Sequence, residues 1–214
     1  MEIGSAKIKL YNNDGSVILF DTTVFEKVDE FSDTLEGNPQ VVVAARLRHR
    51  GSGQQVLFVS LHLKSGYDDM ERRRIREFSA AMAKINRKWN DLGSVPVVVA
   101  GDLNSDYNAA YASLVERFVP SVETPSLRNA AADVGMETKP TYNFWHESVF
   151  DYILISPQLR VLHMKTEDVG AQAPNAKQGS DHFPVTATLV VGASGGGGGG
   201  GESKSNFQEI ELRF

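Results

Sequence analysis

The chain has 214 residues and a mass of 23.5 kDa, and its 41% of hydrophobic residues are enough to bury one core, which predicts one main domain. Its formal net charge of −5 and pI near 5.6 exclude a strong non-specific nucleic-acid coat, so a nucleic-acid contact would need a local basic patch. The lack of cysteine excludes a disulfide framework and a thiolate metal site, and the lack of a long apolar run or a signal-type start predicts an intracellular protein without membrane contact.

In chain order, the first predicted elements are β-strands. Apolar and β-branched residues gather in residues 17–20, 41–47 and 56–63. Residues 48–53 lie between the last two runs and have the glycine and serine content of a hairpin turn. Consecutive antiparallel strands are therefore expected in this part of the chain.

A long amphipathic helix is predicted from Asp68 to about Trp89, because apolar residues recur there at three- and four-residue spacing. These residues are Ile75, Phe78, Met82, Ile85 and Trp89. Asp68 or Asp69 is expected to cap the start of the helix. The opposite face is expected to be solvated, since it carries four arginines. They are Arg72, Arg73, Arg74 and Arg76.

The remaining elements complete an α/β pattern. Further strands are predicted over residues 95–100, 149–155, 159–164 and 185–191, with a short helix over residues 109–118. This order of elements predicts the α/β fold class, as a two-sheet α/β sandwich with mixed, mostly antiparallel sheets.

Composition divides the chain into four parts: residues 1–5, which look like added sequence, a main domain over 6–191, a glycine-rich linker over 192–201 and a strand-like peptide over 202–214. In the last part Ile210, Leu212 and Phe214 alternate with charged residues, which is a strand period. One interpretation is a disordered end. The other is an artificial fusion, in which the peptide adds a strand to a sheet edge or binds a groove of a protein partner.

Polar side chains suited to phosphoester chemistry stand at the ends of predicted strands. Residues 101–104 read Gly-Asp-Leu-Asn, residues 180–182 read Ser-Asp-His, and His62 and Asp151 lie in two further strands. Attack of water on a phosphodiester needs a metal, a carboxylate that orients the water and donors for the developing charge. Hard oxygen ligands favour Mg²⁺, with Mn²⁺ as the alternative. Singly, such residues are more often turn caps or half-buried core groups.

Four motifs in order carry a resemblance to a known family: Ser-Leu-His-Leu-Lys at 60–64, Gly-Asp-Leu-Asn-Ser at 101–105, Asp-Tyr-Ile at 151–153 and Ser-Asp-His-Phe-Pro at 180–184. Together they resemble the endonuclease/exonuclease/phosphatase superfamily, which has the DNase I-like fold. Residues 14–20 and 38–44 resemble its deadenylase-like branch, the nocturnin, Angel and carbon-catabolite-repression type.

The resemblance implies a role for each matched residue. Asp102 would orient or activate the attacking water, and Asn104 would hold a non-bridging phosphate oxygen. His182 would stabilise the pentacovalent phosphorus, while Asp151 would orient a catalytic histidine. His62 would contact the scissile phosphate.

Other matched residues would bind metal or substrate. Asp181, with Asp102, would contribute to the metal site, and Lys64 would offer positive charge to a phosphate. An aromatic trio before Asp151 would form a base-stacking wall, or would instead pack in the core. The trio is Tyr142, Phe144 and Trp145.

The start of the chain departs from the family pattern. In the family an asparagine strand and a Gln-Glu pair with the principal metal ligand precede the Asp-Gly strand, but only about a dozen residues precede Asp14 here. Glu2 stands outside such a pair, and the next glutamates, Glu26, Glu30 and Glu36, follow that strand. The sequence therefore predicts an N-terminally incomplete or rearranged member. It would be a fragment with a weakened metal site, a permuted chain whose residues 207–214 replace the first strand, or a pseudoenzyme.

Three functions follow from this interpretation. The first is a Mg²⁺-dependent 3′–5′ exoribonuclease that removes poly(A), with RNA or an adenine nucleotide as its partner. The second is a nocturnin-like phosphatase acting on the 2′-phosphate of a dinucleotide. The third is a non-catalytic domain that binds a protein through residues 202–214 or an open sheet.

Overall fold

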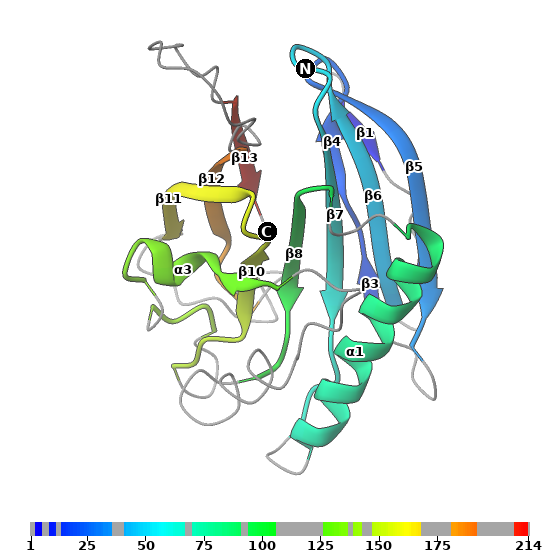
Figure 1. Ribbon diagram of the computed structural model, residues 1–214. Coiled ribbons are helices and arrows are strands. Elements are labelled where there is room, and N and C mark those ends of the chain that lie inside the picture. The colour runs from blue at the N-terminus through cyan, green and yellow to red at the C-terminus, as the bar shows by residue number, and fades with distance from the viewer. Residues whose placement is uncertain are drawn as a thin grey trace.

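The computed structural model of the protein describes residues 3–5, 9–11, 14–35, 41–66, 70–90, 94–105, 126–136, 139–142, 147–167, 181–191 and 208–213. These residues form a large sheet, a small sheet packed on one face of it and a helix packed on the other (Figure 1). Two short pairs accompany them: β1 (Ile3–Ser5) pairs with β4 (Leu19–Asp21), and β2 (Lys9–Tyr11) pairs with β3 (Asp14–Ser16). No helix in these ranges is long and apolar enough to cross a bilayer.

The large sheet has six strands in the order β5-β6-β7-β8-β10-β9. Their bounds are Phe25–Thr34, Val41–His49, Gln55–His62, Val97–Asp102, Asp151–Ile155 and Arg128–Asn129, in that order. The predicted hairpin is confirmed, since β6 and β7 pair antiparallel across residues 50–54. Only β7 and β8 among these neighbours run parallel, because α1 (Glu71–Lys88) carries the chain back between them.

Helix α1 covers the outer face of the large sheet with the residues that its apolar spacing predicts. Phe78, Met82 and Ile85 are buried against β6, β7 and β8. The helix begins at Glu71 with Met70 at its N-cap, and the Met70 side chain makes no cap hydrogen bond. Asp68 and Asp69, the predicted caps, lie outside the described residues.

The prediction of a fully solvated arginine face is wrong for one of its four members. Arg74 is only 4% exposed, because its guanidinium turns toward backbone carbonyls of the segment after β7 instead of toward water. Arg72 and Arg76 are exposed as predicted, and Arg73 is partly exposed.

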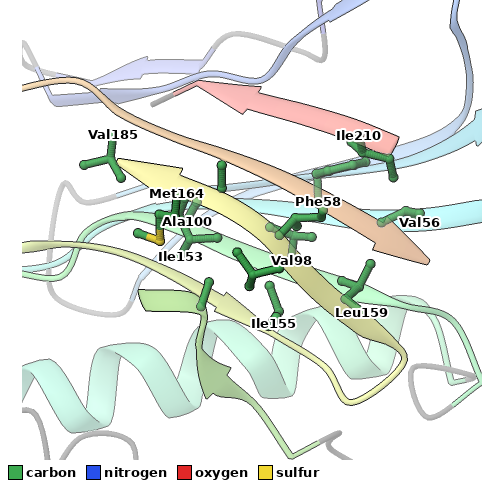
Figure 2. Packing of buried hydrophobic residues seen from close by; sticks show 14 of the residues in the cluster. Val56, Phe58, Val98, Ala100, Ile153, Ile155, Leu159, Met164, Val185 and Ile210 are labelled. Carbon is green, nitrogen blue, oxygen red and sulfur yellow. The ribbon is translucent and has the colours of Figure 1, made fainter. Parts of the chain in front are cut away.

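The small sheet has the order β11-β12-β13, with bounds Leu159–Thr166, Val185–Val191 and Gln208–Arg213. β13 pairs antiparallel with β12 along its whole length, from Val191 opposite Gln208 to Thr186 opposite Arg213. Between the two sheets lies an apolar core to which Phe58, Ile153 and Ile210 contribute (Figure 2). Because helix and small sheet bury both faces of β7, β8 and β10, these strands read as nearly continuous apolar runs.

The described elements that are absent from the predictions include β1, β2, β5, β9 and α3 (Ala130–Asp133). β5, a ten-residue strand at the sheet edge, reads Phe-Glu-Lys-Val-Asp-Glu-Phe-Ser-Asp-Thr. Its many charged residues interrupt the apolar pattern from which a strand is predicted. β9 and α3 are too short to give a periodic signal. The helix predicted over residues 109–118 lies outside the described residues. The predicted fold class, an α/β sandwich with mixed, mostly antiparallel sheets, is confirmed.

Candidate active site

Three strand ends place three polar side chains in one row. His62 ends β7 and lies opposite Asp102, the last residue of β8; Asp102 in turn lies opposite Asp151, the first residue of β10. The His62 Nε2 is 3.6 Å from Asp102 Oδ2. The register of the sheet thus assembles residues that are far apart in the sequence, without any contribution from long loops.

His182 completes this group from the segment that leads into β12. Its Nδ1 lies 2.6 Å from Asp151 Oδ2, and its Nε2 lies 3.7 Å from Asp102 Oδ2. The Asp181 Oδ1 is 4.0 Å from the same Nε2. The hydrogen bond to Asp151 sets the direction of the imidazole, so that its other nitrogen faces Asp102 and Asp181.

Residues around Thr141 hold the imidazole and Asp151 in place. Thr141 Oγ1 accepts hydrogen bonds from the backbone N–H groups of Phe150 and Asp151, each at 3.0 Å. The Thr141 carbonyl accepts the Phe183 N–H at 2.7 Å. The ring of Tyr142 packs edge-on to His182, with centroids 5.1 Å apart. Tyr142 is buried, which agrees with the core-packing alternative for this residue.

The backbone next to Asp102 adopts conformations that explain its glycine and asparagine. Gly101 has a φ of 138°, and a Cβ there would lie 1.9 Å from the Leu61 carbonyl oxygen, so that no other residue fits. Asn104 has a φ of 52°, a region that asparagine tolerates. Its N–H donates to Asp102 Oδ1 at 2.7 Å, and its Nδ2 donates to the Leu63 carbonyl at 3.0 Å.

This arrangement shifts the ionisation of two groups. Burial, and then the negative charge of Asp151, raise the pKa of Asp102 to about 7. Burial by itself would lower the pKa of His182, but the hydrogen bond and charge of Asp151, helped by Asp102 and Asp181, raise it to about 9. Near neutral pH the group therefore pairs a carboxyl able to take up a proton with a protonated imidazole, as acid–base chemistry requires.

A model of the endonuclease/exonuclease/phosphatase family matches residues 13–182, which include every side chain of this group. The chain belongs to that family. The superfamily resemblance predicted from the four motifs is therefore confirmed. No curated protein matches the chain.

Solved structures of several differently named proteins have the same fold. A mannosyl-6-phosphatase of Bacteroides thetaiotaomicron is 20% identical with a TM-score of 0.63 over 82% of this chain and 71% of its own. The human nocturnin catalytic domain with bound sulfate is 22% identical, with a TM-score of 0.65 over 83% of this chain and 64% of its own. A humanized D. rerio TDP2 is 17% identical, with a TM-score of 0.64 over 88% of this chain and 75% of its own. At these identities the similarity shows the fold, and this chain spans about two thirds to three quarters of each relative.

Enzymes of this family generally depend on a divalent metal. Asp102 and Asp181 offer the hard carboxylate oxygens that Mg²⁺ prefers, and both face the same side of His182. The donor chemistry therefore fits, although the described ranges contain no group of three His, Asp or Glu side chains close enough to hold an ion.

Three further residues were predicted for the site. Lys64 is partly buried two residues after His62, while Phe144 and Trp145 lie outside the described residues. Sequence reasoning missed Thr141 and the buried pair Arg74 and Glu77. A signal existed for the pair, since both residues fall at helical spacing on the buried face of α1, together with Phe78 and Ala81.

Proposed function

We propose that this chain is a Mg²⁺-dependent hydrolase of phosphoester bonds. The observation that carries the proposal is the His182 imidazole, which hydrogen-bonds Asp151 through Nδ1 and directs Nε2 toward Asp102. A purely structural ion pair between His182 and Asp151 would not require Asp102, a second partly buried carboxylate, beside it. Membership of the endonuclease/exonuclease/phosphatase family supports the same reaction class.

In the proposed reaction a water oxygen forms a bond to phosphorus while the bond from phosphorus to the leaving oxygen breaks. The leaving oxygen keeps the electron pair of that bond and takes up a proton from solvent. Asp102 orients the water and accepts its proton, since a carboxyl with a pKa of about 7 is ionised in part at neutral pH. His182, protonated and held by Asp151, donates through Nε2 to a phosphoryl oxygen, and His62 contacts the same phosphate. When bound by Asp102 and Asp181, Mg²⁺ would withdraw charge from the phosphoryl oxygens.

The substrate that we propose first is the 3′ end of an RNA, from which adenosines are removed one at a time. Support comes from the resemblance of residues 14–20 and 38–44 to the deadenylase-like branch. A phosphomonoester is the second candidate, because one solved structure of the same fold is a mannosyl-6-phosphatase and another holds a sulfate, an analogue of phosphate. Lys64 would bind the charged phosphate in either substrate.

The test is cleavage of 5′-labelled oligo(A), and release of phosphate from a 2′-phosphorylated dinucleotide, in Mg²⁺ or Mn²⁺. Asp102→Asn and His182→Gln should each lower the rate about 10²–10⁴-fold. The matched control is His163→Gln, on the exposed side of β11, which should leave it unchanged. Activity on the dinucleotide alone would replace the first substrate by the second. No activity on either, with metal present and the chain folded, would favour the non-catalytic protein-binding function.

A further inference from the structure

The segment that follows His62 is held by hydrogen bonds from two sides. On one side the Leu63 N–H donates to the Asp102 carbonyl at 2.9 Å, and the Leu63 carbonyl accepts from Asn104 Nδ2. On the other side the helix α1 supplies the partners: the Lys64 N–H donates to Glu77 Oε2 at 2.9 Å. Both backbone groups of Leu63 and the N–H of Lys64 are thereby fixed.

Arg74 completes this attachment with its planar guanidinium. Its Nε donates to the Lys64 carbonyl at 2.9 Å, and its Nη2 donates to the Gly66 carbonyl. Its Nη1 lies 3.3 Å from Glu71 Oε2. One side chain thus spans two carbonyls of the same segment, an arrangement that needs the fork of donors that arginine has and lysine lacks.

Both helix residues are charged although they are almost completely buried. Arg74 is 4% exposed and Glu77 is 5% exposed. Glu77 also pairs with Arg73 Nε at 2.8 Å. Burying such charges is costly, and an apolar residue of similar volume would often pack at least as stably at such positions. Simple packing of α1 therefore does not account for this choice of residues, whereas fixing the backbone of Lys64 does.

Lys64 lies two residues beyond His62 in a chain that is still paired to Asp102 through Leu63. Leu63 is buried whereas His62 and Lys64 are each partly exposed, the pattern of a chain in which residues two apart project to the same side. We infer that Arg74 and Glu77 are positioning residues, which hold the Lys64 backbone so that its ammonium group meets a substrate phosphate beside His62. This inference rests on the proposed function and specifies which part of the chain binds the phosphate.

The experiment compares Arg74→Lys and Glu77→Ala with Lys64→Ala in steady-state hydrolysis, alone and combined. Each single variant should raise KM about tenfold with little change in kcat, the size expected for one hydrogen bond to a charged group. Because the helix residues act through Lys64, adding Arg74→Lys or Glu77→Ala to Lys64→Ala should cause no further loss. Glu77→Gln should restore most of the affinity, since its amide oxygen still accepts the Lys64 N–H.

The matched control is Arg76→Lys, the same exchange on an exposed position of the same helix, which should leave KM unchanged. Thermal unfolding of every variant separates loss of folding from loss of positioning, and Glu77→Gln keeps the test usable where Glu77→Ala unfolds. Effects that add in the double variants, or an Arg76→Lys variant as weak as Arg74→Lys, would overturn the inference.

A second readout does not require catalysis. Inorganic phosphate should bind the Asp102→Asn variant, and Lys64→Ala, Arg74→Lys and Glu77→Ala, each made in that background, should weaken phosphate binding to the same extent. If the chain hydrolyses no substrate but phosphate binding follows this pattern, the proposed function fails and the positioning role stands. If phosphate binding ignores Arg74 and Glu77, the positioning role fails whatever the activity.

Discussion

At the scale of single residues, His182 is held in its charged form by the carboxylates around it. Its pKa is raised to about 9 from an ordinary 6.5, with Asp151 as the strongest favourable contribution. The pKa of Asp102 is raised to about 7 from 3.8, first by burial and then by the negative charge of Asp151. The folded protein therefore binds protons more tightly than the unfolded chain at both groups.

The free energy of unfolding of the metal-free protein should accordingly fall as the pH rises. The contribution of His182 is complete below its unfolded pKa of 6.5 and is lost as the pH rises through about 9. Urea unfolding in EDTA at several pH values between 6 and 9.5 measures the slope. The slope of unfolding free energy against pH should be smaller in His182→Gln than in the wild type, and unchanged in His163→Gln. Equal slopes in the wild type and both variants would contradict the raised pKa of His182.

The backbone conformation of Gly101 leads to a second prediction for a single residue. Gly101→Ala should destabilise the fold by at least about 1–3 kcal/mol, because the left-handed φ is strained and the new Cβ meets the Leu61 carbonyl. Gly135→Ala is the matched control, with a φ of 69° and open space around the added atom, and should cost about 1 kcal/mol. Denaturant unfolding of both variants measures the two losses of unfolding free energy. Equal losses would mean that the contact between the new Cβ and the Leu61 carbonyl is relieved by a shift of the backbone.

At the scale of elements, α1 serves the fold and the site with different residues of one face. Its apolar side chains pack on the sheet, whereas Arg74 and Glu77, nearer its start, hold the segment after His62. Phe78→Ala should lower the free energy of unfolding by about 3–5 kcal/mol, since the ring is 1% exposed. Ser79→Ala, on the neighbouring exposed position, should stay within about 0.5 kcal/mol.

The same helix shows what sequence patterns predict and what they miss. Phe78 and Met82 follow a period that any amphipathic helix obeys, so their burial was predictable. The burial of Arg74 depends on carbonyls of a segment that only the folded chain brings near, and no local pattern encodes that. His62, Asp102 and Asp151 were predictable as candidates, because Asp102 follows an apolar run and the other two are polar residues inside predicted strands. Their register, which makes them neighbours, was not.

At the scale of the whole molecule, β13 closes the small sheet from the far end of the sequence. Ile210 is 3% exposed and belongs to the core between the sheets. Ile210→Ala should therefore lower the free energy of unfolding by about 2–5 kcal/mol, and Glu209→Ala, on an exposed position, by less than about 0.5 kcal/mol. Thermal unfolding measures both. No change for Ile210→Ala would restore the interpretation of residues 202–214 as a disordered end.

The charged strand β5 has a bearing on how copies of this protein meet one another. It forms one edge of the large sheet and carries acidic and basic side chains along it, among them Glu26, Lys27 and Asp29. An uncovered edge invites strand pairing between molecules, and charges on such an edge make that pairing unfavourable. The charged sequence that makes β5 hard to predict should therefore also disfavour the joining of two large sheets. Concentrated solutions should stay free of aggregates formed through this edge.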